Sequence, residues 1–188
     1  MTDSQLDYAD YLKQRSWKGL LYRRYVLYPR LCRQLTGHVL DIGCGIGDML
    51  AFRPDTEGVD VNPHTVALCR KRGLHAREMA PDRLPYADAA FDGAMMDNVL
   101  EHIAEPGPIL GEVRRVLAPS GTFVCGVPGR RGFAADPDHK VFYDEGALRR
   151  TVETYGFTTR TVFHMPFRSS WLEARMSQYC VYGVFERA

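Results

Sequence analysis

Residues 38–48 read His-Val-Leu-Asp-Ile-Gly-Cys-Gly-Ile-Gly-Asp. The apolar start of this stretch predicts a buried strand, which leads into three alternate glycines, Gly43, Gly45 and Gly47, and then into a helix. Glycine tolerates a positive φ and lets a ligand approach the bare backbone. The first turn of a helix offers free N–H groups. The stretch therefore predicts a ligand site at the carboxyl end of a strand in an open α/β sheet.

The segments on either side alternate between strand and helix patterns. Strands are expected at 38–42, 58–61, 91–96 and 122–127, with a weaker one at 74–77. Helices are expected at 47–52, 63–72 and 108–117, and a helix at 145–155 precedes two closing strands at 157–165 and 178–186. Before residue 37 the pattern is helical, with a break expected near Pro29. This alternation predicts a parallel sheet with helices on both faces.

Composition limits the function classes. The chain has 188 residues, of which 45% are hydrophobic and 25% charged, so it can bury the core of one domain. Its formal net charge of +1 gives no general attraction for nucleic acid. The five cysteines and six histidines are scattered without metal-ligand spacing, so we expect neither a disulfide framework nor a metal site.

The same sequence shows no targeting or membrane signal. No apolar run approaches the roughly 18 residues that would cross a bilayer. The N-terminal residues are acidic and polar, unlike a secretory signal. We therefore expect a cytoplasmic protein without a transmembrane segment.

Two cofactor classes could use the glycine loop: a dinucleotide, or a nucleoside cofactor that has a ribose but no phosphate. In the dinucleotide fingerprint G-x-G-x-x-G/A, the third small residue would fall on Asp48, whose carboxylate would oppose a pyrophosphate at the helix N-terminus. Asp60 ends the next strand, where its carboxylate can accept hydrogen bonds from both hydroxyls of a ribose. A carboxylate at this position is common to both cofactor classes. Asp60 therefore predicts that a nucleoside binds but does not distinguish the two classes.

Two later motifs favour one class. Leu84-Pro85-Tyr86 precedes Phe91-Asp92, and then come Leu100-Glu101-His102 and a helix pattern that ends in Arg115-Val116-Leu117-Ala118-Pro119-Ser120-Gly121. In order and spacing, these motifs and the G-x-G-x-G loop after Asp41 resemble the class I S-adenosylmethionine-dependent methyltransferases, in the type 11 branch of small-molecule enzymes. The resemblance is close over about residues 37–127.

The resemblance implies an α/β fold: a doubly wound, mostly parallel, seven-stranded Rossmann-like sheet with helices on both faces. It implies an N-terminal helical cap over 1–36 and a methyltransferase domain over 37–188. The implied cofactor is S-adenosylmethionine, with Asp41 behind its ammonium group and Asp60 on its ribose. The residues expected to bind it are Asp41, Gly43, Cys44, Gly45, Gly47, Asp60, Val61, Asp97 and Asn98.

Adenine recognition departs from the family pattern. The family usually places an acidic residue four positions before the leucine of the Leu-Pro motif, where this chain has Ala80, followed by Pro81. Glu78 and Met79 are the alternatives for this contact.

The acceptor side is expected to lie in the loop 129–140 and the residues that follow it. His102 and His139 are the candidate general bases, because an imidazole titrates near neutral pH. Arg131 and Tyr143 are candidate substrate contacts, and His139 and Tyr143 would share a helical face if the next helix began early. A small-molecule, lipid or glycan acceptor is expected, since no dedicated RNA-binding domain is present.

Three alternatives stay open from the sequence. The chain could be a nicotinamide-dependent oxidoreductase, or a catalytically inactive methyltransferase-like module that binds the cofactor or a partner. The basic and aromatic segment 13–33 could bind nucleic acid or an anionic membrane surface. The simpler interpretation of this segment is an amphipathic helix that packs inward Trp17, Leu20, Leu21, Tyr28 and Leu31.

Overall fold

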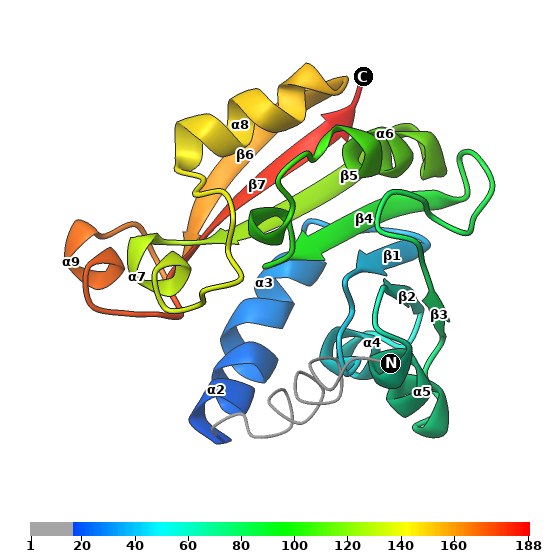
Figure 1. The fold of residues 1–188 in the computed structure, drawn as a ribbon, viewed down its shortest axis with the longest axis horizontal. Coiled ribbons are helices and arrows are strands. Elements are labelled where there is room, and N and C mark those ends of the chain that lie inside the picture. The colour runs from blue at the N-terminus through cyan, green and yellow to red at the C-terminus, as the bar shows by residue number, and fades with distance from the viewer. Residues whose placement is uncertain (1–16) are drawn as a thin grey trace.

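The structure is a computed structural model that describes residues 17–188, and residues 1–16 lie outside the described part. Seven strands form one sheet in the order β3-β2-β1-β4-β5-β7-β6 (Figure 1). The first five strands in this order pair in parallel, and β7 is antiparallel to both β5 and β6. The predicted mostly parallel, seven-stranded sheet is therefore confirmed. The strands are β1 (Val39–Ile42), β2 (Thr56–Asp60), β3 (Ala76–Glu78), β4 (Phe91–Asp97), β5 (Leu117–Pro128), β6 (Phe157–Met165) and β7 (Cys180–Arg187).

Strand β5 begins earlier than the sequence pattern predicts. We expected a strand over 122–127, but Leu117 already pairs with Phe91 of β4. A register shift follows, and regular pairing resumes at Thr122. The irregular residues in between interrupt the alternation of apolar and polar side chains, so a period-two pattern could not detect the start of this strand.

Helices α5 and α8 begin where a side chain satisfies a free backbone N–H group. The side-chain oxygen of Asn62 accepts a hydrogen bond from His64 N before α5, and Asp144 accepts one from Ala147 N before α8. Pro63 supplies a fixed φ in the first turn of α5. The helices after β1 are α4 (Asp48–Phe52), α5 (Pro63–Lys71), η2 (Leu100–His102), α6 (Gly107–Val116), α7 (Arg130–Phe133), α8 (Glu145–Thr154) and α9 (Ser170–Glu173).

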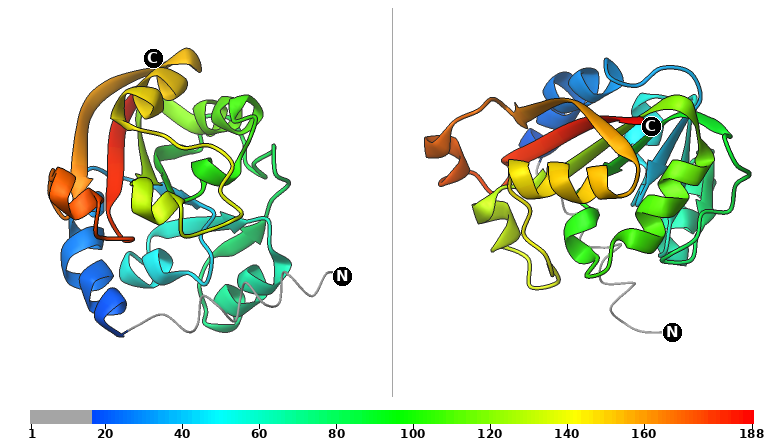
Figure 2. Two further views of the ribbon diagram at one scale, coloured as in Figure 1. Left: turned by 60° about the vertical axis from the view of Figure 1, so that its left-hand side comes forward. Right: turned by 90° about the horizontal axis from the view of Figure 1, so that it is seen from above.

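The two faces of the sheet bury two apolar clusters. Val39, Met95 and Val124 of the central strands belong to the cluster that includes the buried residues of the N-terminal helical segment. Leu40 and Met96, which directly follow Val39 and Met95 in the sequence, belong to the cluster beneath α6 and α8. Successive side chains of a strand point to opposite faces of the sheet. Figure 2 shows these helices on opposite sides of the sheet.

The N-terminal helical segment runs through Pro29 without the expected break. It consists of α2 (Trp17–Tyr22), a π-helical turn η1 (Arg23–Leu27) and α3 (Tyr28–Cys32). Proline has no N–H to donate to the preceding turn and its ring crowds that turn. The wider π-helical turn directly before Pro29 accommodates both effects.

The expected inward packing of this segment is only partly correct. Tyr28 and Leu31 are buried against the sheet, as predicted, but Trp17, Leu20 and Leu21 are exposed. The reason is geometric, since α3 lies over the sheet whereas α2 extends past its edge (Figure 1).

We expect two glycine-to-alanine substitutions to change stability in opposite directions. A methyl group at Gly126 would overlap the fully buried ring of Tyr182, so Gly126→Ala should lower the free energy of unfolding by about 1–3 kcal/mol. A methyl group at Gly111, on the exposed side of α6, meets nothing within 4 Å. Gly111→Ala should raise stability by about 0.5–1 kcal/mol. Urea denaturation measures both, and equal effects would contradict this packing.

Candidate functional site

The glycine loop leaves β1 through three residues with positive φ. Gly43, Gly45 and Gly47 have φ of 74°, 54° and 79°, which residues with a Cβ rarely adopt. A side chain at Gly43 would overlap Val99, and one at Gly47 would press on Leu74 and Cys69. Both glycines therefore allow close packing against neighbouring segments, and Gly43 and Gly45, unlike Gly47, also line the pocket described below.

Asp60, at the end of β2, holds this loop in place. Its Oδ2 accepts a hydrogen bond from Gly45 N at 2.7 Å, and its Oδ1 accepts one from Asn62 N at 2.8 Å. Burial raises the pKa of Asp60, and the two backbone hydrogen bonds oppose that effect. The cap of α5 is the side chain of Asn62, so Asp60 is not merely a helix cap.

A pocket of about 650 Å³ lies at the carboxyl ends of β1, β2 and β4. Of the predicted cofactor and catalytic residues, it is lined by Asp41, Gly43, Cys44, Gly45, Asp60, Val61, Asp97, Asn98 and His102. Gly47, His139, Arg131 and Tyr143 do not line it, and neither do Glu78 and Met79, the suggested adenine contacts. The structure thus brings together most of the predicted cofactor residues, which come from three separate segments.

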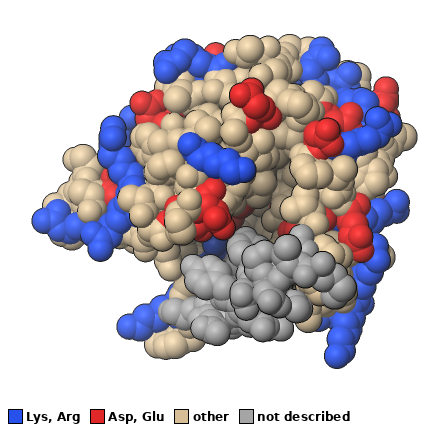
Figure 3. Space-filling view, viewed as in Figure 1, with Lys and Arg blue, Asp and Glu red and all other residues tan. Residues whose placement is uncertain are grey.

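The described lining is strongly acidic. It contains six aspartates and a single Lys or Arg side chain, that of Arg23; the aspartates are Asp41, Asp48, Asp60, Asp97, Asp136 and Asp138. Burial, followed by the neighbouring charges of Asp97 and Asp60, raises the pKa of Asp41 well above its usual range. On the face shown in Figure 3, Lys and Arg side chains lie mostly toward the margin, and acidic side chains lie both there and nearer the centre. Such a pocket favours a cationic ligand over a phosphate.

Asp97 is fixed by groups from three elements. The Tyr182 hydroxyl of β7 donates to its Oδ1 at 2.7 Å, and Asn98 Nδ2 donates to the same oxygen at 3.0 Å. Arg23 Nη1, from η1, lies 3.5 Å from the other oxygen. Burial by itself would lower the pKa of Arg23, but Asp97, Tyr28 and Tyr182 together outweigh burial, so the pKa of Arg23 is raised.

Sequence reasoning did not single out Arg23 or Tyr182 as site residues. Arg23 was one of many cations in the segment 13–33, and the pattern could not show which of them turns toward the sheet. Tyr182 lies in the last strand, far from any motif. Its antiparallel pairing with β5 places it beside the end of β4.

The loop after β5 forms one wall of the pocket. Ala135, Asp136, Pro137 and Asp138 line the cavity, so the loop lies at the carboxyl edge of the sheet as expected. It is not irregular throughout, because it contains the short helix α7.

The other residues predicted from this region lie elsewhere. Tyr143 is 4% exposed within the main core, and Arg131 is exposed on the surface. Helix α8 begins only at Glu145, so His139 and Tyr143 do not share a helical face. The side chain of His139 is 8% exposed and lies behind the pocket wall.

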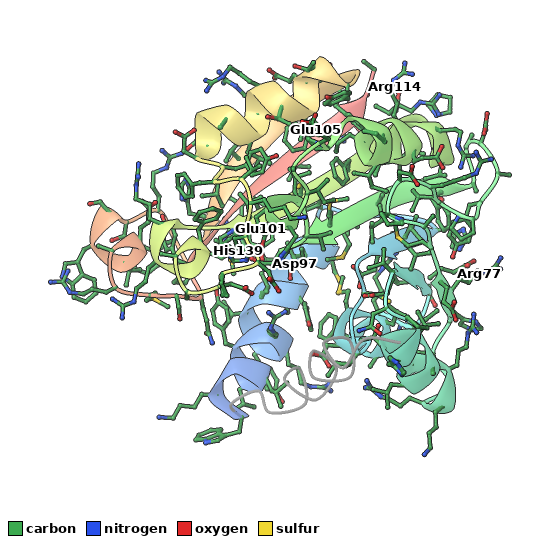
Figure 4. All side chains as sticks on the ribbon, viewed as in Figure 1. Arg77, Asp97, Glu101, Glu105, Arg114 and His139 are labelled. Carbon is green, nitrogen blue, oxygen red and sulfur yellow. The ribbon has the colours of Figure 1, made fainter. Side chains whose placement is uncertain are left out.

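Glu101 was not selected from the sequence, although it lies in a quoted motif. It is fully buried on η2, and burial raises its pKa to about 8. His139 Nε2 lies 3.7 Å from its Oε1, and the rings of His102 and His139 meet edge to face at 4.6 Å. Burial and then His139 lower the pKa of His102. Figure 4 shows Glu101, His139 and Asp97 near the end of β4.

Comparisons with known proteins agree with this geometry. Residues 40–125 match a family model described as a methyltransferase domain. A protein of Mycolicibacterium smegmatis named "Probable S-adenosylmethionine-dependent methyltransferase" is 32% identical over 160 residues, which cover 76% of this chain and 62% of that protein. A ubiquinone/menaquinone biosynthesis C-methyltransferase of Desulfotalea psychrophila is 30% identical over 99 residues, covering 47% and 40%.

Solved structures show the same fold. A methyltransferase in complex with the Trm112 activator of Haloferax volcanii has a TM-score of 0.78 at 18% identity, covering 100% of this chain and 99% of that one. A methyltransferase of Thermotoga maritima has a TM-score of 0.74 at 17% identity, covering 96% and 98%. The chain therefore has the fold of these solved methyltransferases, and residues 40–125 match the methyltransferase-domain family.

The chain spans less than two thirds of the length of the two relatives named above. Within the described residues, no helix combines the length and the apolar character that a membrane span needs.

The hydroxyl of Tyr182 should stabilise the fold through Asp97. Tyr182→Phe keeps the buried ring but leaves Asp97 with one donor fewer, so we expect a loss of about 1.5–3 kcal/mol in the free energy of unfolding. Tyr25→Phe is the matched control, because Tyr25 is 69% exposed. Denaturation in urea compares the two variants, and equal stability would show that Asn98 and Arg23 suffice to hold Asp97.

Proposed function

We propose that this protein is an S-adenosylmethionine-dependent methyltransferase that acts on a small-molecule, lipid or glycan acceptor. The observation that carries the proposal is the acidic pocket built around the G-x-G-x-G loop. The cofactor bears an ammonium and a sulfonium and no phosphate, so clustered carboxylates complement it. The same carboxylates would repel the pyrophosphate of a nicotinamide cofactor, which argues against an oxidoreductase.

The residues present fit the cofactor. Gly43 and Gly45 expose backbone at the pocket wall, where a side chain would obstruct the methionine end. The buried carboxyl of Asp41 would take the ammonium group, and Asp60, whose oxygens each have a second lone pair, would accept the ribose hydroxyls. When bound, the cofactor supplies an activated methyl group. The protein supplies alignment and excludes water.

The acceptor would enter between His102 and the loop 135–138. These residues line the same pocket as the glycine loop, and they include Asp136 and Asp138. His102 reaches the pocket whereas His139 supports it from behind, so the two predicted bases act as one cluster with Glu101. Among the relatives, one is named for ubiquinone and menaquinone biosynthesis and another as a sterol 4-C-methyltransferase of Caenorhabditis elegans. Their names support a small acceptor.

Calorimetry should distinguish the cofactor classes. We expect binding of S-adenosylmethionine and of its demethylated product in the micromolar range, and no measurable binding of NAD, because of the six aspartates of the pocket. Tight binding of NAD alone would overturn the assignment. Transfer of a labelled methyl group to a metabolite pool would separate an enzyme from an inactive binding module.

Asp60→Ala should weaken cofactor binding roughly tenfold or more, because charge-assisted hydrogen bonds contribute about 1.5–3 kcal/mol. It removes both the expected ribose contact and the bond that holds Gly45. Asp144→Ala is the control, since it removes the cap of α8 at a cost of about 1 kcal/mol in stability and Asp144 does not line the pocket. Dissociation constants for the demethylated cofactor give the answer. Equal affinities in both variants would limit Asp60 to a structural role.

A further inference from the structure

Glu101, His102 and His139 form a cluster that the sequence spacing does not reveal. Glu101 and His102 are neighbours on η2, and His139 follows α7. One ligand atom of each residue lies within 4.8 Å of the others. Figure 4 shows Glu101 and His139 at the same place, between the end of β4 and the loop after α7.

The backbone holds the two halves of the cluster together. The N–H groups of Lys140 and Val141 donate to the carbonyl oxygen of Glu101 at 2.8 and 3.1 Å. These bonds join the residues after His139 to η2, although they are far apart in sequence. The positions of the three side chains are therefore fixed by the fold rather than by a flexible surface loop.

The hydrogen bond of His139 determines where its lone pair points. Its Nδ1 lies 2.8 Å from the carbonyl oxygen of Phe133. A carbonyl oxygen can only accept, so Nδ1 carries the proton and Nε2 of the neutral ring presents a lone pair. Metal-binding imidazoles are commonly oriented in this way by a bond from the other nitrogen.

That lone pair faces a buried carboxylate. Glu101 is fully buried, and neither of its carboxylate oxygens has a hydrogen-bond partner among the described residues. Its Oε1 lies 3.7 Å from His139 Nε2, which is longer than a direct hydrogen bond. Two acceptors that face each other in a buried site are unfavourable unless a proton or a metal ion lies between them.

We propose that Glu101, His102 and His139 bind a divalent transition-metal ion. Two imidazoles and one carboxylate suit zinc, manganese or iron(II), whereas calcium and magnesium prefer oxygen ligands. Bonds of about 2.0–2.2 Å place ligand atoms roughly 3–3.5 Å apart, so only a modest contraction of the cluster is needed. Asp136, whose Oδ2 lies 3.9 Å from His139 Nε2, adds a further negative charge.

The role of the ion rests on the proposed methyl transfer. His102 lines the pocket, so an open coordination position could face the acceptor. Bound there, an acceptor hydroxyl would lose its proton to water more readily. The new oxygen–carbon bond then forms as the sulfur–carbon bond breaks, and the cofactor leaves as a neutral thioether. His102 and His139 act as ligands in this scheme, and the ion takes the place of an imidazole base.

Metal titration of the full, untagged chain tests the site. After removal of bound metal with a chelator, Zn²⁺ should bind with one equivalent, and Co²⁺ should give the visible absorption of nitrogen–oxygen coordination. His139→Ala and Glu101→Gln should each weaken binding tenfold or more. His164→Ala is the matched control, because His164 is similarly buried and also pairs with a carboxylate, that of Glu145, at 3.2 Å. It should bind as the unmodified protein does.

The outcomes separate this proposal from the previous one. Lack of Zn²⁺ binding by the unmodified protein, or equal binding by all variants, would overturn the metal site. Glu101 and His139 would then share a proton instead of a metal ion. Circular dichroism confirms that each variant is folded, and added Zn²⁺ should raise the melting temperature of the unmodified protein but not of His139→Ala. Calorimetry with the demethylated cofactor reports on the proposed function independently, since metal can bind whether or not the cofactor does.

Discussion

The site depends on one carboxylate, that of Asp60. It links the end of β2 to the glycine loop through Gly45 N and to the start of α5 through Asn62 N. The loop needs such a support because three of its residues are glycines with positive φ. Glycine loses more conformational entropy on folding than any other residue. With Asp60 in place, the bare backbone of Gly43 and Gly45 faces the pocket in one conformation.

A second constraint is the concentration of negative charge at the carboxyl ends of the strands. Asp41 and Asp97 come from adjacent parallel strands, so they meet at the same edge of the sheet. Asp97 is stabilised by Tyr182, Asn98 and Arg23, whereas burial and its acidic neighbours raise the pKa of Asp41. The fold thus maintains a potential that a cationic ligand would relieve. Clustered negative charges lower the stability of the fold. Such clusters are therefore characteristic of binding sites, where a ligand compensates for the repulsion.

The third element of the site is the connection between η2 and the loop after β5. The carbonyl group of Glu101 accepts two backbone hydrogen bonds from that loop, and the Phe133 carbonyl orients His139. The wall of the pocket and the histidine cluster behind it are consequently one structural unit. A change in either half is expected to affect the acceptor side without disturbing Asp60 and the glycine loop.

The sequence by itself determined the sheet, the glycine loop and most of the side chains that line the pocket at the carboxyl ends of β1, β2 and β4. These depend on local patterns. Buried parallel strands appear in the sequence as apolar runs. Gly43, Gly45 and Asp60 follow or end such strands, and in this fold class the carboxyl ends of the strands lie at one edge of the sheet. Only the tertiary structure decided which side chain of the N-terminal segment reaches Asp97, that Tyr182 supports it, and that Tyr143 is buried in the core. It also decided that Glu101 and His102 meet His139. Such contacts join residues far apart in the chain, and they depend on how helices and loops pack against the sheet, which no local periodicity encodes.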